Sequence, residues 1–300
     1  MSLKKNGVFN PIGIFDSGIG GLTVLKEIRK ELPREDLVYF GDTARVPYGT
    51  KSKETITKFS LDNVNFLQSF NVKMVIVACN TASSLSLDVL QKKFPMPVVG
   101  VIEPGAKAAL TQTKNGRIGV IGTKSTIGSN SYETCLRRID PAVKVYSSAC
   151  PLFVPFVEEG WLEGEVISKV AEAYLESFKT FKVDTLILGC THYPLLTKII
   201  QKTVGSKVCL VNSAEETARE ASRLMIKLKI TQSGASSSDM KFYVSDEPEQ
   251  FRILGERFLG HPIPSVAKVA EHYRQPDFDR RFHTDEQGEP IAEKVLEGHV

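Results

Sequence analysis

The chain has 300 residues, of which 42% are hydrophobic and 24% are charged, a composition typical of a globular protein with a core of ordinary density. Lysine and arginine together exceed aspartate and glutamate by only 3, an excess too small to indicate a nucleic acid as partner. No apolar run approaches the roughly 18 residues of a membrane-spanning helix, and no signal-type apolar core follows the amino terminus, so we expect a cytoplasmic protein without a membrane partner.

Strand-like apolar runs alternate with helical patterns along the whole chain, which predicts an α/β fold with doubly wound parallel sheets. The expected strands are 12–15, 37–40, the run before Cys79, 98–102, 117–121, 143–147, the run before Cys190, 208–211 and 241–244. The expected helices are 22–31, 54–70, one after each of these two cysteines, 106–113, 164–181, 215–229 and 248–259. Segment 231–239 is expected to be a flexible loop, and 271–300 a surface tail.

The second half of the chain repeats the first. Residues 117–123 mimic 11–17 at an offset of 106 positions, and Cys79 and Cys190 are 111 positions apart. These similar offsets indicate an ancient duplication. We therefore predict two similar doubly wound parallel-sheet domains, related by a pseudo-twofold duplication, with the active site in the cleft between them. Because the pattern restarts at 103–105, the predicted domains are 1–103 plus 214–300, and 104–213.

Two cysteines lie at matching places in the two halves, each where an apolar run stops. The carboxyl ends of parallel strands are where ligands bind, so each half is expected to present one thiol to the cleft. The small hydroxyl and amide residues that follow suit a helix N-cap, and a helix amino terminus would favour the thiolate. A single buried cysteine is more often a small core residue, but the repeated position favours function for Cys79 and Cys190.

The chemistry of the two thiols follows from where a shared carbon would lie. In a near-attack arrangement each sulfur would be about 3–3.5 Å from that carbon, and the two sulfurs about 7 Å apart. This is far beyond a disulfide bond, which favours proton transfer over redox chemistry. The five cysteines include no CxxC pair, which argues against a disulfide framework or a zinc site and indicates a reducing compartment. No metal is expected.

Polar residues near these strand ends are further candidates. Asp16 either caps the next helix or binds a substrate ammonium and serves the Cys79 proton relay. The glycines after it match neither the dinucleotide-binding nor the P-loop spacing. His192, two residues after Cys190, is placed to act as a base or to stabilise a thiolate. Residues 48–49 offer backbone N–H groups for a carboxylate, although turn formation explains them equally well.

Six motifs in order make the chain resemble the glutamate racemases of the aspartate/glutamate racemase superfamily. They cover about 12–259 and read GIFDSGIGGLTVL, YFGDTARVPYG, ACNTAS, PLFVPFVEEG, LGCTHYP and FYVSDEPE. The resemblance implies a cofactor-independent enzyme that interconverts L- and D-glutamate and supplies D-glutamate for peptidoglycan. A homodimer is also expected.

The resemblance also implies roles for individual residues. Cys79 and Cys190 are then the two acid/base residues, and Asp16, His192 and either Glu158 or Glu159 assist them. The implied substrate contacts are Asp16, Ser17, Tyr48, Gly49, Asn80, Thr81, Thr191 and His192.

Racemisation suits such a pair, since one group removes the Cα proton and the other returns a proton to the opposite face. The resemblance implies that Cys79 takes the proton of D-glutamate and Cys190 that of L-glutamate. Three alternatives stay open at this point. They are a two-cysteine enzyme with another substrate, such as aspartate racemase or maleate isomerase, a non-catalytic binding protein with the same cleft, and a thiol–disulfide oxidoreductase.

Overall fold

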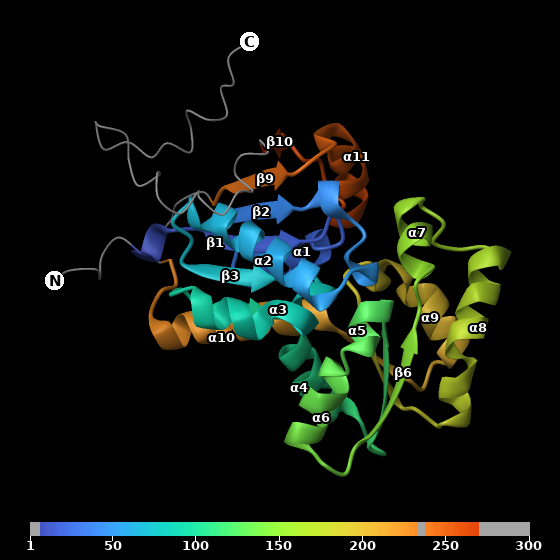
Figure 1. Ribbon diagram of the computed structural model, residues 1–300. Helices are drawn as coiled ribbons and strands as arrows, with labels where there is room; N and C mark the ends of the chain where they lie inside the picture. Colours follow the sequence, from blue (N-terminus) through green and yellow to red (C-terminus); the bar gives the residue numbers. More distant parts are fainter. Residues whose placement is uncertain (1–6, 233–237, 270–300) are drawn as a thin grey trace, which may run out of the picture.

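The computed structural model describes residues 7–232 and 238–269, and it forms two lobes, each built around a parallel β-sheet (Figure 1). The first sheet has the strand order β10 (Ala267–Lys268), β9 (Met240–Val244), β2 (Leu37–Gly41), β1 (Ile12–Asp16), β3 (Met74–Val77) and β4 (Val98–Gly100). The second has the order β6 (Lys144–Ala149), β5 (Arg117–Gly122), β7 (Thr185–Gly189) and β8 (Cys209–Asn212). The predicted fold class is confirmed.

The two sheets share one topology. In each, the first strand is central, the second lies on one side of it and the third and fourth on the other, so β2-β1-β3-β4 corresponds to β6-β5-β7-β8. All of these neighbours pair in parallel. A common strand order is what the predicted duplication requires. The domain limits at 103/104 and 213/214 stay a prediction, although the strands divide between the sheets on either side of them.

Helices connect the strands and cover the sheets. The α-helices are α1 (Leu22–Glu31), α2 (Lys53–Gln68), α3 (Asn80–Lys93), α4 (Ile102–Gln112), α5 (Lys124–Gly128), α6 (Ser131–Ile139), α7 (Phe153–Glu158), α8 (Glu165–Thr180), α9 (Thr197–Val204), α10 (Ser213–Leu228) and α11 (Pro248–Leu259). Short 3₁₀ helices are η1 (Gly7–Phe9), η2 (Thr43–Arg45), η3 (Tyr48–Thr50) and η4 (Tyr193–Leu196). Within the described part of the chain, no helix is long and apolar enough to cross a membrane.

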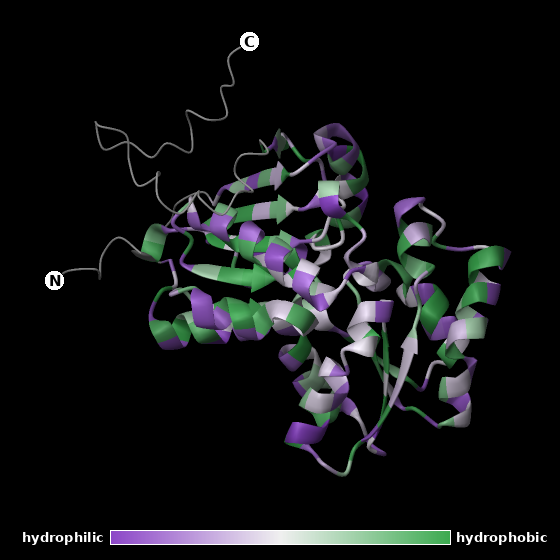
Figure 2. Cartoon of the chain, viewed as in Figure 1, coloured by the Kyte–Doolittle hydropathy of each residue, from purple (hydrophilic) through white to green (hydrophobic). Residues whose placement is uncertain are grey.

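The hydrophobic core explains why the strands read as continuous apolar runs. Every residue of β1, β2, β3 and β7 is buried, as expected for parallel strands covered on both faces. The edge strand β6 is only partly buried and is correspondingly pale in the hydropathy view (Figure 2). One core cluster fills the space between the first sheet and helices α2 and α3. The other runs without a break from α1 into the second sheet, so the two lobes share a core.

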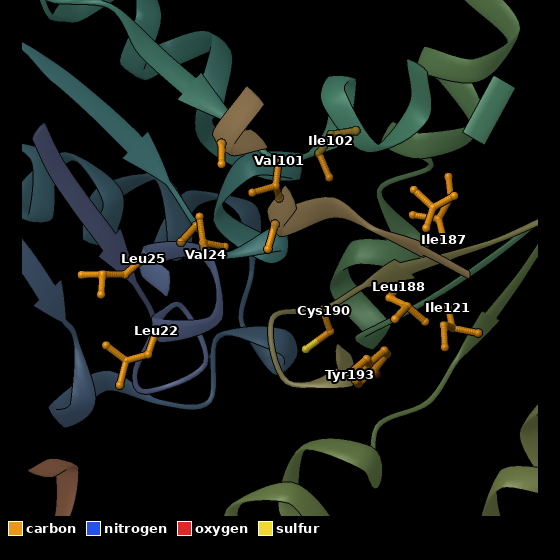
Figure 3. Close-up of a cluster of buried hydrophobic side chains, with 14 of the residues drawn as sticks. Leu22, Val24, Leu25, Val101, Ile102, Ile121, Ile187, Leu188, Cys190 and Tyr193 are labelled. Carbon is orange, nitrogen blue, oxygen red and sulfur yellow. The ribbon is translucent and has the colours of Figure 1, made fainter. Parts of the chain in front are cut away.

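Figure 3 shows part of this shared core, with Cys190 between side chains of α1 and side chains of β5 and β7. Helix α10 contributes to the same junction, because it packs against both α1 and α4. The last β–α unit returns to the first lobe, where β9 pairs with β2 and α11 packs on α1. Apolar packing around α1, α4 and α10 therefore holds the two lobes together.

Some expected elements need correction. Helix α4 begins at Ile102 and not at 106, because Pro104 is tolerated in a first turn, where its missing N–H has no partner to lose. Three short helices, α5, α6 and α7, had no counterpart among the expected elements, since segments below ten residues show little periodicity. Most of the expected 231–239 loop, and the tail 271–300, lie outside the described residues.

Candidate active site

The predicted residues gather at the carboxyl ends of three strands. Asp16 is the last residue of β1, Cys79 follows β3 across a single residue, and Cys190 directly follows β7. Strands β1 and β3 are neighbours in register, so Asp16 and Cys79 lie at the same edge of the first sheet. Asp16 is fully buried, and each cysteine is 6% exposed. Both cysteines are free thiols, as proton transfer requires.

On the first half, a short chain of polar atoms leads from Cys79 to Asp16. The Cys79 Sγ lies 3.7 Å from the Ser17 hydroxyl, which donates to Asp16 Oδ2 at 3.4 Å. The backbone N–H of Gly18 donates to the same oxygen at 3.1 Å. The other oxygen, Asp16 Oδ1, is buried and has no hydrogen-bond partner among the described residues. A buried carboxylate oxygen left unpaired is costly, so Asp16 is prepared to accept from a cationic group.

The electrostatics of this half differ from what the helix position suggests. Burial raises the pKa of Asp16, against the opposing effects of His192 and of the backbone N–H groups of Gly18 and Gly21. Burial, and then the charge of Asp16, raise the pKa of Cys79 to about 12, and the N–H of Ala82 at the start of α3 lowers it only in part. Cys79 is therefore a thiol at neutral pH in this arrangement. The helix end does favour the Cys79 thiolate, as predicted, but desolvation and the charge of Asp16 outweigh it.

On the second half, Cys190 is backed by a histidine and a carboxylate. Cys190 Sγ lies 3.8 Å from His192 Nδ1, and His192 Nε2 lies 3.1 Å from Glu158 Oε1 at the end of α7. Burial by itself lowers the pKa of His192, but its hydrogen bonds to Cys190 and Glu158 outweigh burial and raise it to about 10. His192 is thus an imidazolium at neutral pH and places a positive charge beside the Cys190 sulfur.

This geometry separates the two adjacent glutamates. Glu158 reaches His192, whereas Glu159 is exposed at the carboxyl end of α7. The Glu158 side chain is itself 43% exposed, so it contacts solvent on one side and the buried imidazole on the other. Of the two glutamates that the sequence left undecided, Glu158 is the one that contacts His192.

The local structure around the two cysteines is not the capped helix that was expected. Cys79 is itself the N-cap of α3, and Asn80 and Thr81 are the first helical residues and not its caps. After Cys190 the chain makes a turn and enters η4, with Pro194 in its first turn, and α9 begins only at Thr197. The amino terminus of an α-helix therefore does not adjoin Cys190, and His192 is the cationic group at that sulfur.

The two halves touch at these strand ends. An added Cβ on Gly20 would lie 2.2 Å from Thr191 Oγ1 and 2.5 Å from His192 Nδ1, so only glycine fits there. The hydroxyl of Thr23 donates to the Thr191 carbonyl at 3.0 Å. The charge of His192 lowers the pKa of Asp16, and that of Cys190 contributes to the raised pKa of Cys79. The two predicted half-sites thus form one electrostatically coupled site.

The Tyr48–Gly49 segment also meets the second half. The Tyr48 hydroxyl is buried, donates to Asp42 and accepts from Asn63 Nδ2 at 3.1 Å, so its side chain holds the loop in place. The Gly49 carbonyl accepts from the Ser125 hydroxyl at 2.8 Å on α5. Because the Tyr48 hydroxyl is engaged in this way, a substrate contact here stays a prediction for the backbone N–H groups of the segment.

Sequence reasoning missed a cluster of hydroxyl groups between the halves. Thr81 Oγ1 lies 3.0 Å from Thr123 Oγ1 and 3.3 Å from Thr126 Oγ1. Thr123 is the repeat counterpart of Ser17 at the offset of 106, so the duplication contained the signal that could have found it.

Within 7–232 and 238–269, His, Cys, Asp and Glu side chains form no group of three or more that could hold a metal ion.

Comparisons with known proteins give a consistent picture. The sequence profile of the family described as Asp/Glu/Hydantoin racemase matches residues 12–221. The curated glutamate racemase of Geobacter metallireducens is 52% identical over 259 residues, which cover 86% of this chain and 96% of that protein.

Solved structures agree with this. The crystal structure of glutamate racemase from Francisella tularensis in complex with D-glutamate superposes with a TM-score of 0.82 at 40% identity, over 88% of this chain and 98% of that one. The Escherichia coli glutamate racemase in complex with L-glutamate and the activator UDP-MurNAc-Ala gives a TM-score of 0.72 at 29% identity, over 87% and 98% of the two chains. The likeness extends over both lobes.

Proposed function

The chain belongs to the Asp/Glu/Hydantoin racemase family, and on that premise we propose how its two thiols carry out a racemisation. Its activity is that of a glutamate racemase, an isomerase that interconverts L- and D-glutamate. In this family the D-glutamate serves peptidoglycan synthesis. The observation that carries the mechanism is the pair of free, buried thiols at equivalent strand ends, each with its own set of polar partners.

Each partner set suits one direction of the reaction. Starting from L-glutamate, a Cys190 thiolate takes the Cα proton beside the His192 imidazolium, and the Cys79 thiol gives a proton to the opposite face. Starting from D-glutamate, the two roles are exchanged. The Asp16 charge contributes to the high pKa of Cys79, so an ammonium group paired with Asp16 Oδ1 would make the Cys79 thiolate easier to form.

The carbanion between the two proton transfers needs donors around the substrate carboxylates. The side chains of Ser17, Asn80, Thr81 and Thr191, and the N–H groups at Tyr48–Gly49, are the proposed donors. The hydroxyls of Thr123 and Thr126 extend this set from the second lobe. Burial of both sulfurs keeps water away from the intermediate, which protects it from stray protons. As the resemblance implies, the proposed reaction uses no cofactor.

We also propose that the enzyme is a cytoplasmic homodimer. All five cysteines are unpaired, which is consistent with a reducing compartment. Size-exclusion chromatography with light scattering measures the mass of the assembly directly. A mass of one chain at micromolar concentration would remove the dimer from the proposal.

The mechanism is tested by incubating the protein with D-glutamate in deuterated water without added cofactor. We expect the circular dichroism of the amino acid to decay to zero while deuterium enters the product at Cα. Retention of the optical signal would refute the assignment. Parallel incubations with L- and D-aspartate measure selectivity, and faster turnover of aspartate would reassign the substrate.

A further inference from the structure

One chain of hydrogen bonds connects the first turn of α3 to the second half of the molecule. The Tyr132 hydroxyl, on α6, donates to Asn80 Oδ1 at 2.7 Å. The same hydroxyl lies 3.0 Å from Oγ of Ser213, the first residue of α10. All three side chains are buried. Residues of three separate helices thus form a chain that ends on the neighbour of Cys79.

The distances define the direction in which protons are donated along this chain. A separation of 2.7 Å is ordinary for an O–H donor but short for an N–H donor, so Tyr132 donates and the Asn80 carbonyl oxygen accepts. Ser213 then donates to Tyr132 at 3.0 Å, since its other acceptor, the Leu188 carbonyl, is 3.5 Å away. Burial raises the pKa of Tyr132, which keeps its proton in place. Each bond in such a chain strengthens the next.

This direction settles which way the Asn80 amide faces. With Oδ1 held by Tyr132, Nδ2 points away from the phenol and makes no hydrogen bond to another residue of the described segments. Its N–H donors are therefore left for a partner outside the described residues, such as a bound substrate. A flipped amide would place an N–H against the phenol and its carbonyl oxygen toward the substrate, where it would repel a carboxylate.

We propose that Tyr132 is a positioning residue of the racemase, because its hydroxyl holds the Asn80 amide with Nδ2 directed at a carboxylate of bound glutamate. The inference rests on the proposed function. Tyr132 acts through Asn80 and touches no reacting atom. A merely structural tyrosine, which ties α6 to α3, would affect stability without affecting substrate affinity.

A double-mutant cycle separates these two roles. Tyr132→Phe removes only the hydroxyl, and we expect kcat/KM to fall about tenfold for both enantiomers, mainly through a higher KM, because a bond that orients a charge-binding donor is lost. In an Asn80→Ala background the same substitution has no further effect. The control is Ser86→Ala in α3, which removes a buried hydroxyl bonded to Ser60 at 2.9 Å and Ala82 at 2.6 Å, and lowers the unfolding midpoint without changing KM.

Two results would overturn the proposal: an equal loss from Tyr132→Phe in both backgrounds, or an unchanged KM in the otherwise intact enzyme. If Tyr132→Phe does not fold, Ser213→Ala is taken through the same cycle, with a smaller expected loss of about threefold that again disappears without Asn80. An equal loss there also contradicts it. Failure of the unsubstituted protein to racemise glutamate would instead refute the proposed function, so the two failures are distinguishable.

Discussion

Glu158→Gln tests whether a carboxylate holds the charge on His192. The substitution keeps the size of the side chain but removes the negative charge 3.1 Å from His192 Nε2. A hydrogen bond to a charged group contributes about 1.5–3 kcal/mol, and the lower end applies because the Glu158 side chain is 43% exposed and screened by solvent. At 1.36 kcal/mol per unit, the pKa of His192 falls from about 10 by roughly one unit.

The main consequence for activity falls at alkaline pH. His192 stays protonated at pH 7 in both proteins, so we expect less than about a tenfold loss of activity there. Between pH 8 and 10, however, the decline of kcat/KM moves about one unit toward neutral pH. The assay is racemisation of each enantiomer followed by circular dichroism across this range. Glu159→Gln, at the exposed neighbouring carboxylate, is the matched control and leaves the profile in place.

Stability gives a second measurement of the same effect. The pKa of His192 is higher in the folded protein than its ordinary 6.5, so its contribution to stability is complete below about pH 6.5 and disappears as the pH rises through about 10. Glu158→Gln therefore lowers the urea midpoint at pH 6.5 and has little effect above pH 10. The role given to Glu158 would be refuted if Glu158→Gln left the decline of kcat/KM between pH 8 and 10 unmoved. It would also be refuted if Glu159→Gln moved that decline equally.

Three further substitutions test other parts of the structure. We expect Cys79→Ser to lose most turnover but still to bind glutamate, as measured by calorimetry. Near-normal racemisation would remove Cys79 from the mechanism. Gly20→Ala places a methyl group 2.2 Å from Thr191 Oγ1, so the two lobes must move apart at this contact. We expect kcat to fall by at least about 100-fold, and normal kinetics would contradict the contact. Lys73→Met breaks a buried ion pair with Glu35 at 2.5 Å. We expect the free energy of unfolding, measured in urea, to fall by about 3–5 kcal/mol with KM unchanged. A loss below about 1 kcal/mol would show that water solvates the pair in the folded protein.

Local sequence was sufficient for the framework of the fold. Apolar runs covered on both faces specify buried parallel strands by their composition alone, so the strands ending near Cys79 and Cys190 could be recognised without a structure. The repeat offset then paired the two cysteines, and the common strand order of the two sheets agrees with that pairing. Helices of ten residues or more were predicted with errors of a few residues at their ends, because the residue at which a helix ends depends on capping and tertiary packing.

The tertiary structure decided what surrounds each of these residues. Whether Glu158 or Glu159 reaches His192 depends on how α7 packs, and the hydroxyl cluster at Thr123 depends on the contact between two lobes. The pKa of Cys79 could not be derived from the sequence, because a helix terminus can be recognised along the chain, whereas desolvation depends on every neighbour in space. Periodicity along the chain thus determines the strands and the longer helices. Burial, charge coupling and hydrogen bonds between distant segments exist only once the two lobes are packed together.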